Sequence, residues 1–154
     1  MKESVGLKGF GLMVCRDKDG KILWESEFTN TITNAGFAVL SGLAGNVGSE
    51  VAFTYLALGT SSTAPAASQT ALGGEITTNG LQRASATVTQ ETTTQTDDTL
   101  RLYKLFTATG SSTVEEVGIF NDASAGTMLG RALTGAKSLS SGNTLGIYYK
   151  VRFS

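Results

Sequence analysis

The stretch Leu145-Gly146-Ile147-Tyr148-Tyr149-Lys150-Val151-Arg152-Phe153 decides the fold class of this chain. Apolar residues occupy every odd-numbered position of the stretch, and the even-numbered positions hold Gly, Tyr, Lys and Arg. Because side chains alternate between the two faces of a strand, this period of two is typical of a strand with one buried face. We therefore expect residues 145–153 to lie inside a sheet, with Tyr149 in the core and Tyr148, Lys150 and Arg152 facing outward.

A hairpin is expected near the start of the chain. Apolar residues from Gly9 to Cys15 precede the turn-forming sequence Asp17-Lys18-Asp19-Gly20, and alternation resumes from Ile22 to Phe28. An Asp-Gly pair between two such runs is a hairpin signal. In the second strand Trp24 is expected to face the core, with Glu25 and Glu27 on the opposite side. Residues 1–10 are expected to form an N-terminal arm that reaches a neighbouring subunit.

One short helix is expected from about residue 34 to residue 44. Asn34 is a residue type that caps a helix N-terminus, and Gly45-Asn46 is typical of a C-terminal stop. The spacing of three and four predicts a single apolar face, composed of Phe37, Leu40, Leu43 and Ala44. A helix this short needs a sheet to pack against.

The rest of the chain consists of short strand-like runs separated by Gly, Ser and Thr. The expected strands are Phe53 to Leu58, Gln82 to Thr94, Leu100 to Thr107, Val114 to Phe120 and Met128 to Leu133. Short strands at regular spacing favour a sandwich or a barrel. The sequence therefore predicts a mainly β fold: one antiparallel β-sandwich or barrel domain over residues 1–154, with about seven or eight strands and one helix.

Composition excludes several classes of function. The chain has 154 residues, of which 40% are hydrophobic and 16% are charged, whereas an average domain has roughly 25% charged residues. With no His and one Cys, it holds no His-based catalytic triad, no Cys/His zinc site and no intrachain disulfide. The net charge of −1 and the scattered basic residues argue against nucleic-acid binding. The apolar run Phe10 to Val14 is too short to span a membrane. The single unpaired Cys leads us to expect synthesis in a cytoplasm.

The acidic residues that could bind a metal ion or act in acid–base catalysis are each better explained by a structural role in a turn or a strand. Asp17 to Gly20 resembles the opening of a calcium loop, but Phe28 stands where that loop needs its Glu. Glu115 and Glu116 point to opposite faces of a strand, and Asp97-Asp98 is expected in a turn. We therefore expect no catalytic residue, no metal site and no cofactor.

Two motifs resemble those of small structural proteins of tailed bacteriophage virions. The first is Leu56-Ala57-Leu58-Gly59-Thr60 with the loop around Pro65 that follows it. The second is Glu116-Val117-Gly118-Ile119-Phe120-Asn121, which leads to Met128 and Arg131. The resemblance covers roughly residues 28–153, and it implies a β-sandwich that decorates the capsid or belongs to the tail. It brings no catalytic residues.

The function expected from these observations is that of a capsid decoration, or cement, protein on the outside of the head. Its expected partners are further copies of itself, as a homotrimer, and the major capsid protein. The alternative is a tail, baseplate or fibre-attachment protein that binds other tail proteins, and a more distant one is a carbohydrate-binding module. The residues expected to form the interface are Lys8, Phe10, Tyr148, Lys150 and Arg152.

Overall fold

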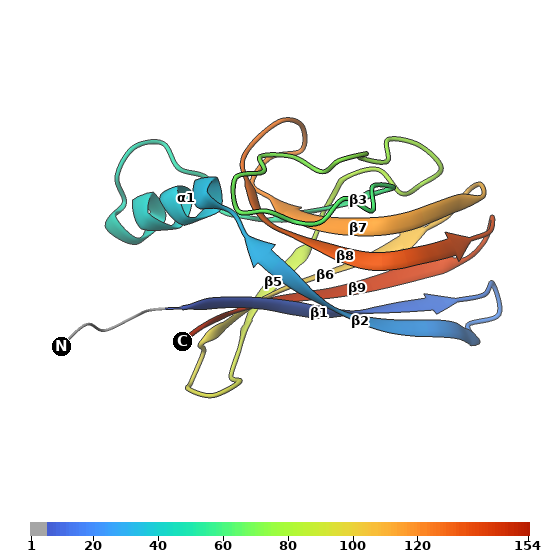
Figure 1. Cartoon of the computed structure of the whole chain (residues 1–154). Coiled ribbons are helices and arrows are strands. Elements are labelled where there is room, and N and C mark those ends of the chain that lie inside the picture. The colour runs from blue at the N-terminus through green and yellow to red at the C-terminus, as the bar shows by residue number, and fades with distance from the viewer. Residues whose placement is uncertain (1–5) are drawn as a thin grey trace.

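The strands predicted from the sequence form one antiparallel sheet that curls on itself (Figure 1). The structure is a computed structural model that describes residues 6–154. Its elements, in chain order, are β1 (Leu7–Arg16), β2 (Ile22–Ile32), α1 (Asn34–Gly45), β3 (Tyr55–Gly59), β4 (Ala84–Ser85), β5 (Thr87–Glu91), β6 (Thr99–Thr107), β7 (Ser112–Phe120), β8 (Met128–Leu139) and β9 (Thr144–Phe153).

The sheet is an almost closed barrel. Its nine strands follow the order β4-β3-β7-β8-β2-β1-β9-β6-β5, so that β4 and β5 lie at the two edges. These edge strands are consecutive in the chain and are separated by Ala86, whose N–H donates to the carbonyl of Thr54 next to β3. The predicted fold class is confirmed. The strand number is slightly higher than expected because the run from Gln82 to Thr94 divides into two strands that serve opposite edges.

The inward faces of β1, β6 and β9 fill the barrel. Tyr149 is completely buried there, as expected, and its hydroxyl accepts a hydrogen bond of 2.6 Å from the amide of Asn30. The ring of Phe28 meets the Tyr149 ring edge to face, with 5.0 Å between centroids. Burial raises the pKa of Tyr149 well above its ordinary value, although the hydrogen bond from Asn30 acts in the opposite direction. Cys15 is also buried, and desolvation raises the pKa of its thiol, so it is an unreactive core residue.

The hairpin of β1 and β2 is confirmed. The register runs from Phe10 opposite Thr29 to Arg16 opposite Ile22, with a bulge next to Cys15. Trp24 packs against the core but is only partly buried. The expected arm needs correction, because residues 7–10 belong to β1 and pair with β9 from Leu7 opposite Phe153 to Phe10 opposite Lys150. Residues 1–5 of that predicted arm lie outside the described residues.

The helix lies at one end of the barrel and differs from its prediction in two respects. The N-cap is Thr33 rather than Asn34, because the Thr33 hydroxyl accepts from the N–H of Gly36 and donates to the carbonyl of Met128. The expected apolar face was also wrong in part: Leu40 packs against the core as expected, but Phe37 is 46% exposed and Leu43 is 36% exposed.

Close packing at Gly36 explains which face of α1 meets the barrel. A Cβ atom at this position would lie 2.7 Å from the Cα atom of Leu129, so only glycine lets the helix approach so closely. Gly36 and Val39 are therefore the buried positions of α1. The C-terminal stop is confirmed, with Asn46 in the left-handed conformation. Over residues 6–154, no helix has both the length and the apolar character to cross a membrane.

The identity of the cap is testable. Replacing Thr33 with Ala removes the N-terminal cap and leaves the buried carbonyl of Met128 without its donor, so T33A is expected to lower the free energy of unfolding by about 1–3 kcal/mol. Asn34 is exposed, and N34A should therefore change stability by less than about 0.5 kcal/mol. Urea denaturation followed by circular dichroism measures both variants. A larger loss for N34A than for T33A would contradict this cap.

Candidate functional site

The five predicted interface residues lie on one surface. Lys8 and Phe10 belong to β1, and Tyr148, Lys150 and Arg152 belong to β9. These strands are neighbours, and Lys8 pairs with Arg152 while Phe10 pairs with Lys150. All five side chains lie on the outside of the barrel, since the residues between them on β9, Tyr149 and Val151, are buried in the core. The structure thus brings the two halves of the predicted interface together.

The neighbouring strands β5 and β6 add further residues to this surface. Tyr103 of β6 pairs with Tyr148, and their ring centroids are 4.7 Å apart. Glu91 of β5 bonds to Lys150 at 2.6 Å and to Arg101 of β6 at 3.3 Å. We call this surface the outer patch; its members are Lys8, Phe10, Glu91, Arg101, Tyr103, Tyr148, Lys150 and Arg152. Sequence reasoning missed the β5 and β6 members because nothing in one sequence shows that β6 lies beside β9.

The outer patch is suited to protein contacts. A hollow of about 320 Å³ lies between Leu12, Glu91, Arg101, Tyr148 and Lys150. The Arg101 guanidinium lies over the rings of Tyr103 and Tyr148, at 5.8 Å and 5.2 Å from their centroids. Desolvation, together with the nearby Tyr148, raises the pKa of Tyr103. Tyrosine and arginine are enriched at protein interfaces, where their flat side chains provide contact area and hydrogen bonds.

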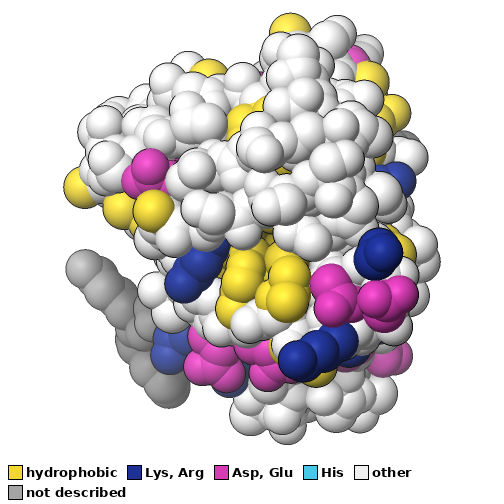
Figure 2. Space-filling model, turned by 90° about the vertical axis from the view of Figure 1, so that its right-hand side faces the viewer, with side chains coloured by type: hydrophobic (Ala, Val, Ile, Leu, Met, Phe, Trp, Pro, Cys, Tyr) yellow, Lys and Arg dark blue, Asp and Glu magenta, His cyan; other side chains and the backbone are white. Residues whose placement is uncertain are grey.

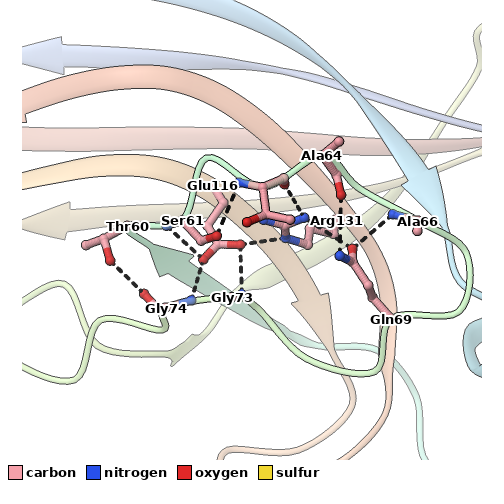
Figure 3. A network of polar contacts seen from close by, with 10 residues as sticks. Thr60, Ser61, Ala64, Ala66, Gln69, Gly73, Gly74, Glu116 and Arg131 are labelled. Carbon is pink, nitrogen blue, oxygen red and sulfur yellow. Dashed lines mark hydrogen bonds and ion pairs between the residues drawn. The ribbon is translucent and has the colours of Figure 1, made fainter.

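A second polar cluster lies on the opposite side of the barrel, on the outside of β7 and β8 (Figure 3). Glu116 and Arg131 form a buried ion pair, with 2.5 Å between a carboxylate oxygen and Nε. The carboxylate also accepts from the backbone N–H groups of Ser61, Gly73 and Gly74 at 3.2, 3.1 and 2.8 Å. The carboxylate thereby anchors both ends of the loop formed by residues 60–74.

The guanidinium of Arg131 holds the middle of the same loop. Its Nη1 donates to the carbonyl of Thr63 at 2.7 Å and to the side chain of Gln69 at 3.1 Å. The Gln69 oxygen in turn accepts from the N–H of Ala66 at 3.0 Å. Because each partner of the ion pair bonds to the loop backbone directly or through Gln69, the network is a clamp that fixes an irregular segment onto the outer face of the sheet.

Neither carboxylate pair considered in the sequence is placed for acid–base chemistry. Glu116 is completely buried under the loop, whereas Glu115 is only partly buried. The Asp98 carboxylate accepts from the backbone N–H groups of Thr93, Thr94 and Gln95, which confirms its turn role. Desolvation acts to raise the pKa of Asp98, but these hydrogen bonds outweigh it and hold the pKa well below its usual value.

The turn at Asp17 is also structural. Its carboxylate accepts from the N–H groups of Asp19 and Lys21 at 2.9 and 3.0 Å, as expected of a turn residue. Over residues 6–154 no group of three or more acidic, His or Cys side chains gathers in a way that could hold a metal ion.

The clamp generates a prediction about stability. Replacing Arg131 with Met leaves the Glu116 charge buried without a counterion, so R131M should lower the free energy of unfolding by about 3–5 kcal/mol. The double variant E116Q/R131M removes that charge but keeps an acceptor for Gly74, and it should recover part of the loss. Urea denaturation measures stability, and amide hydrogen exchange at Gly73 and Gly74 reports on the loop. Wild-type stability of R131M would contradict the proposed role.

Comparison with known proteins gives one family. Residues 25–150 match the protein-family model described as "Podophage GP4 fiber I protein gp80". The matched region contains α1, β3 to β8, β9 as far as Lys150, and the clamp. It includes five members of the outer patch: Glu91, Arg101, Tyr103, Tyr148 and Lys150. Neither the curated proteins nor the solved structures gave a match to this chain.

Proposed function

The chain belongs to the podophage GP4 fiber I protein family, and from this premise we propose that it is a structural protein of a phage tail fibre. The family match, which covers residues 25–150, is the observation that carries this proposal. Membership makes the chain a structural protein of a tailed-phage virion, as the sequence motifs implied. It favours the tail alternative over the capsid decoration role that we first expected.

We propose that the outer patch is the surface through which the protein docks on another tail protein. Its aromatic and arginine side chains match the usual composition of protein interfaces. Lys8, Arg101, Lys150 and Arg152 surround Glu91 in the outer patch, and the carboxylates of Glu25 and Glu27 on β2 border the patch on the side of Phe10. A partner surface with acidic residues opposite β9 and β6, around an apolar centre, would complement it.

The structure gives less support to the carbohydrate-binding alternative. A sugar-binding platform needs an aromatic ring with a free face. Tyr148 is only partly exposed and packs beside Tyr103, and Arg101 lies over both rings. The same arrangement is well suited to a protein partner, which can pair its own side chains with the arginine.

The location is tested by immunogold labelling of the assembled phage. An epitope tag on the exposed β7–β8 loop, at Ser124, lies away from the outer patch and should label the tail. Label confined to the head would contradict the fibre proposal and would favour the capsid decoration role instead.

The docking surface is tested by charge reversal. Lys150→Glu places a carboxylate beside Glu91, so it should disturb the patch by repulsion and should lower incorporation into particles roughly tenfold or more. The matched control is Ser62→Glu, which adds a negative charge to the exposed loop on the far side of the barrel. Quantitative immunoblots of purified particles measure incorporation, and thermal melting shows whether the variants are folded. Equal incorporation of both folded variants would contradict docking through the outer patch.

A further inference from the structure

The two ends of the barrel expose hydrophobic side chains. At the α1 end, exposed apolar residues occur on the helix, on the segment after it, on β5 and at the end of β9: Phe37, Leu43, Val47, Val51, Val88 and Phe153. At the hairpin end, Ile22 is 43% exposed and Leu23 is 49% exposed. Soluble proteins rarely leave contiguous apolar surface open to water, so clusters of this kind mark contact sites.

The α1 end contains an apolar groove. Its volume is about 430 Å³, which lies within the range of roughly 300–1,000 Å³ that is usual for binding pockets. The apolar lining comes from α1, from strands β5, β6 and β9, and from the segment that precedes β3. Its residues are Leu40, Leu43, Phe53, Val88, Leu100 and Phe153. The groove therefore fits bulky apolar side chains rather than a polar ligand.

The charged side chains that line this groove are both acidic. They are Asp97 and Asp98, at the turn between β5 and β6. The hydrogen bonds from Thr93, Thr94 and Gln95 keep the Asp98 carboxylate in place, and they favour its ionised form. An occupant that carries a cation next to its apolar side chains would match both the apolar lining and the carboxylates of Asp97 and Asp98.

The hairpin of β1 and β2, at the other end of the same barrel, carries cations next to exposed apolar side chains. Lys21 directly precedes Ile22 and Leu23, and the three cations Arg16, Lys18 and Lys21 outnumber the two carboxylates of the same turn, Asp17 and Asp19. Lys18, Lys21, Ile22 and Leu23 are all exposed. Figure 2 views this end and shows hydrophobic side chains gathered in the middle, with Lys, Arg, Asp and Glu side chains around and below them.

The hairpin end is also rigid and accessible. Asp17 accepts two backbone N–H bonds within the turn, and Arg16 donates to the carbonyl of Gly20 at 3.2 Å. Within residues 6–154, β2 pairs with β8 only from Asn30 to Ile32, so nearer the turn the edge of β2 makes no strand pairing on that side, although the Lys137 ammonium of β8 lies 5.8 Å from the centroid of a Trp24 ring. A preorganised projection of this kind loses little conformational freedom when it binds.

We propose that copies of this protein stack end to end, with the Lys21–Leu23 segment of one copy seated in the apolar groove of the next. Ile22 and Leu23 supply the apolar contact, while Lys21 and Lys18 lie near Asp97 and Asp98. Figure 1 shows the hairpin turn and α1 at opposite ends of the barrel, separated by the length of β1, about 33 Å for ten residues. This contact joins two different surfaces, so each added copy leaves one groove and one hairpin free.

A stack of this kind differs from the homotrimer expected from the sequence. A closed ring needs its two contact surfaces to be inclined toward each other, and here they lie at opposite ends of the molecule. The stack is independent of the proposed fibre role, because it is a property of the purified chain.

The test is sedimentation velocity of the purified full chain from roughly 1 µM to 1 mM, the range in which weak contacts associate. The wild type should form species that lengthen with concentration. Leu23→Asp removes the apolar projection, and Val88→Asp introduces a charge into the groove, so each variant alone should be monomeric. Leu43→Lys, on exposed α1, provides a second groove variant in case Val88→Asp does not fold. Thr89→Asp is the matched control, since it adds the same charge on the opposite face of β5 and should still associate.

Mixing the variants identifies the geometry. L23D keeps an intact groove and V88D keeps an intact hairpin, so a 1:1 mixture should form dimers but nothing longer. A wild type that stays monomeric up to 1 mM, a variant that associates as the wild type does, or a mixture that stays monomeric would each overturn the proposal. Labelling of the virion head would contradict the fibre role alone and would leave the stacking result unaffected.

Discussion

Strand β9 hydrogen-bonds to β1 on one side and to β6 on the other, and both registers extend over nearly its whole length. Every residue from Thr144 to Phe153 faces a partner on β1, and those from Thr144 to Arg152 also face one on β6. The two pairings fix which side of each strand is inside. Because neighbouring residues face opposite sides, the register that buries Tyr149 and Val151 also places Tyr148, Lys150 and Arg152 outside. The core and the outer patch are therefore two consequences of one hydrogen-bonded ladder.

The opposite side of the barrel needs a further constraint, since a long irregular loop lies over the outer face of β7 and β8. The backbone N–H groups of residues 60–74 have few regular partners, and the carboxylate of Glu116 supplies acceptors for three of them. Arg131 neutralises that carboxylate and binds the rest of the loop. A buried ion pair is a weak source of stability when compared with apolar packing. Here it is better understood as a device that selects one conformation for an irregular segment.

Local patterns predicted those parts of the structure that depend on neighbours in the chain. The alternation of residues 145–153 and the Asp-Gly turn each determine their own geometry, and both predictions are confirmed. Residues 82–94 divide into β4 and β5 because β4 pairs with β3 at one edge of the sheet and β5 pairs with β6 at the other. No local pattern in the sequence contains that information. The cap at Thr33 depends on the carbonyl of Met128, and the buried face of α1 depends on the backbone at Leu129. Similarly, Glu91, Arg101 and Tyr103 join the predicted interface residues only because β6 lies beside β9.

The pairing of β1 with β9 also determines the order in which the protein can be completed on the ribosome. Backbone hydrogen bonds join Gly6 to Ser154, and the whole of β1 faces residues that are about 130 or more positions away in the chain. Until residues 144–153 have been synthesised, one edge of β1 and one edge of β6 have no partner, and unpaired edges of this kind are sites of aggregation. Contacts between distant residues also slow folding. These edges therefore remain open to intermolecular pairing until residues 144–153 emerge, and β9 then joins β1 to β6.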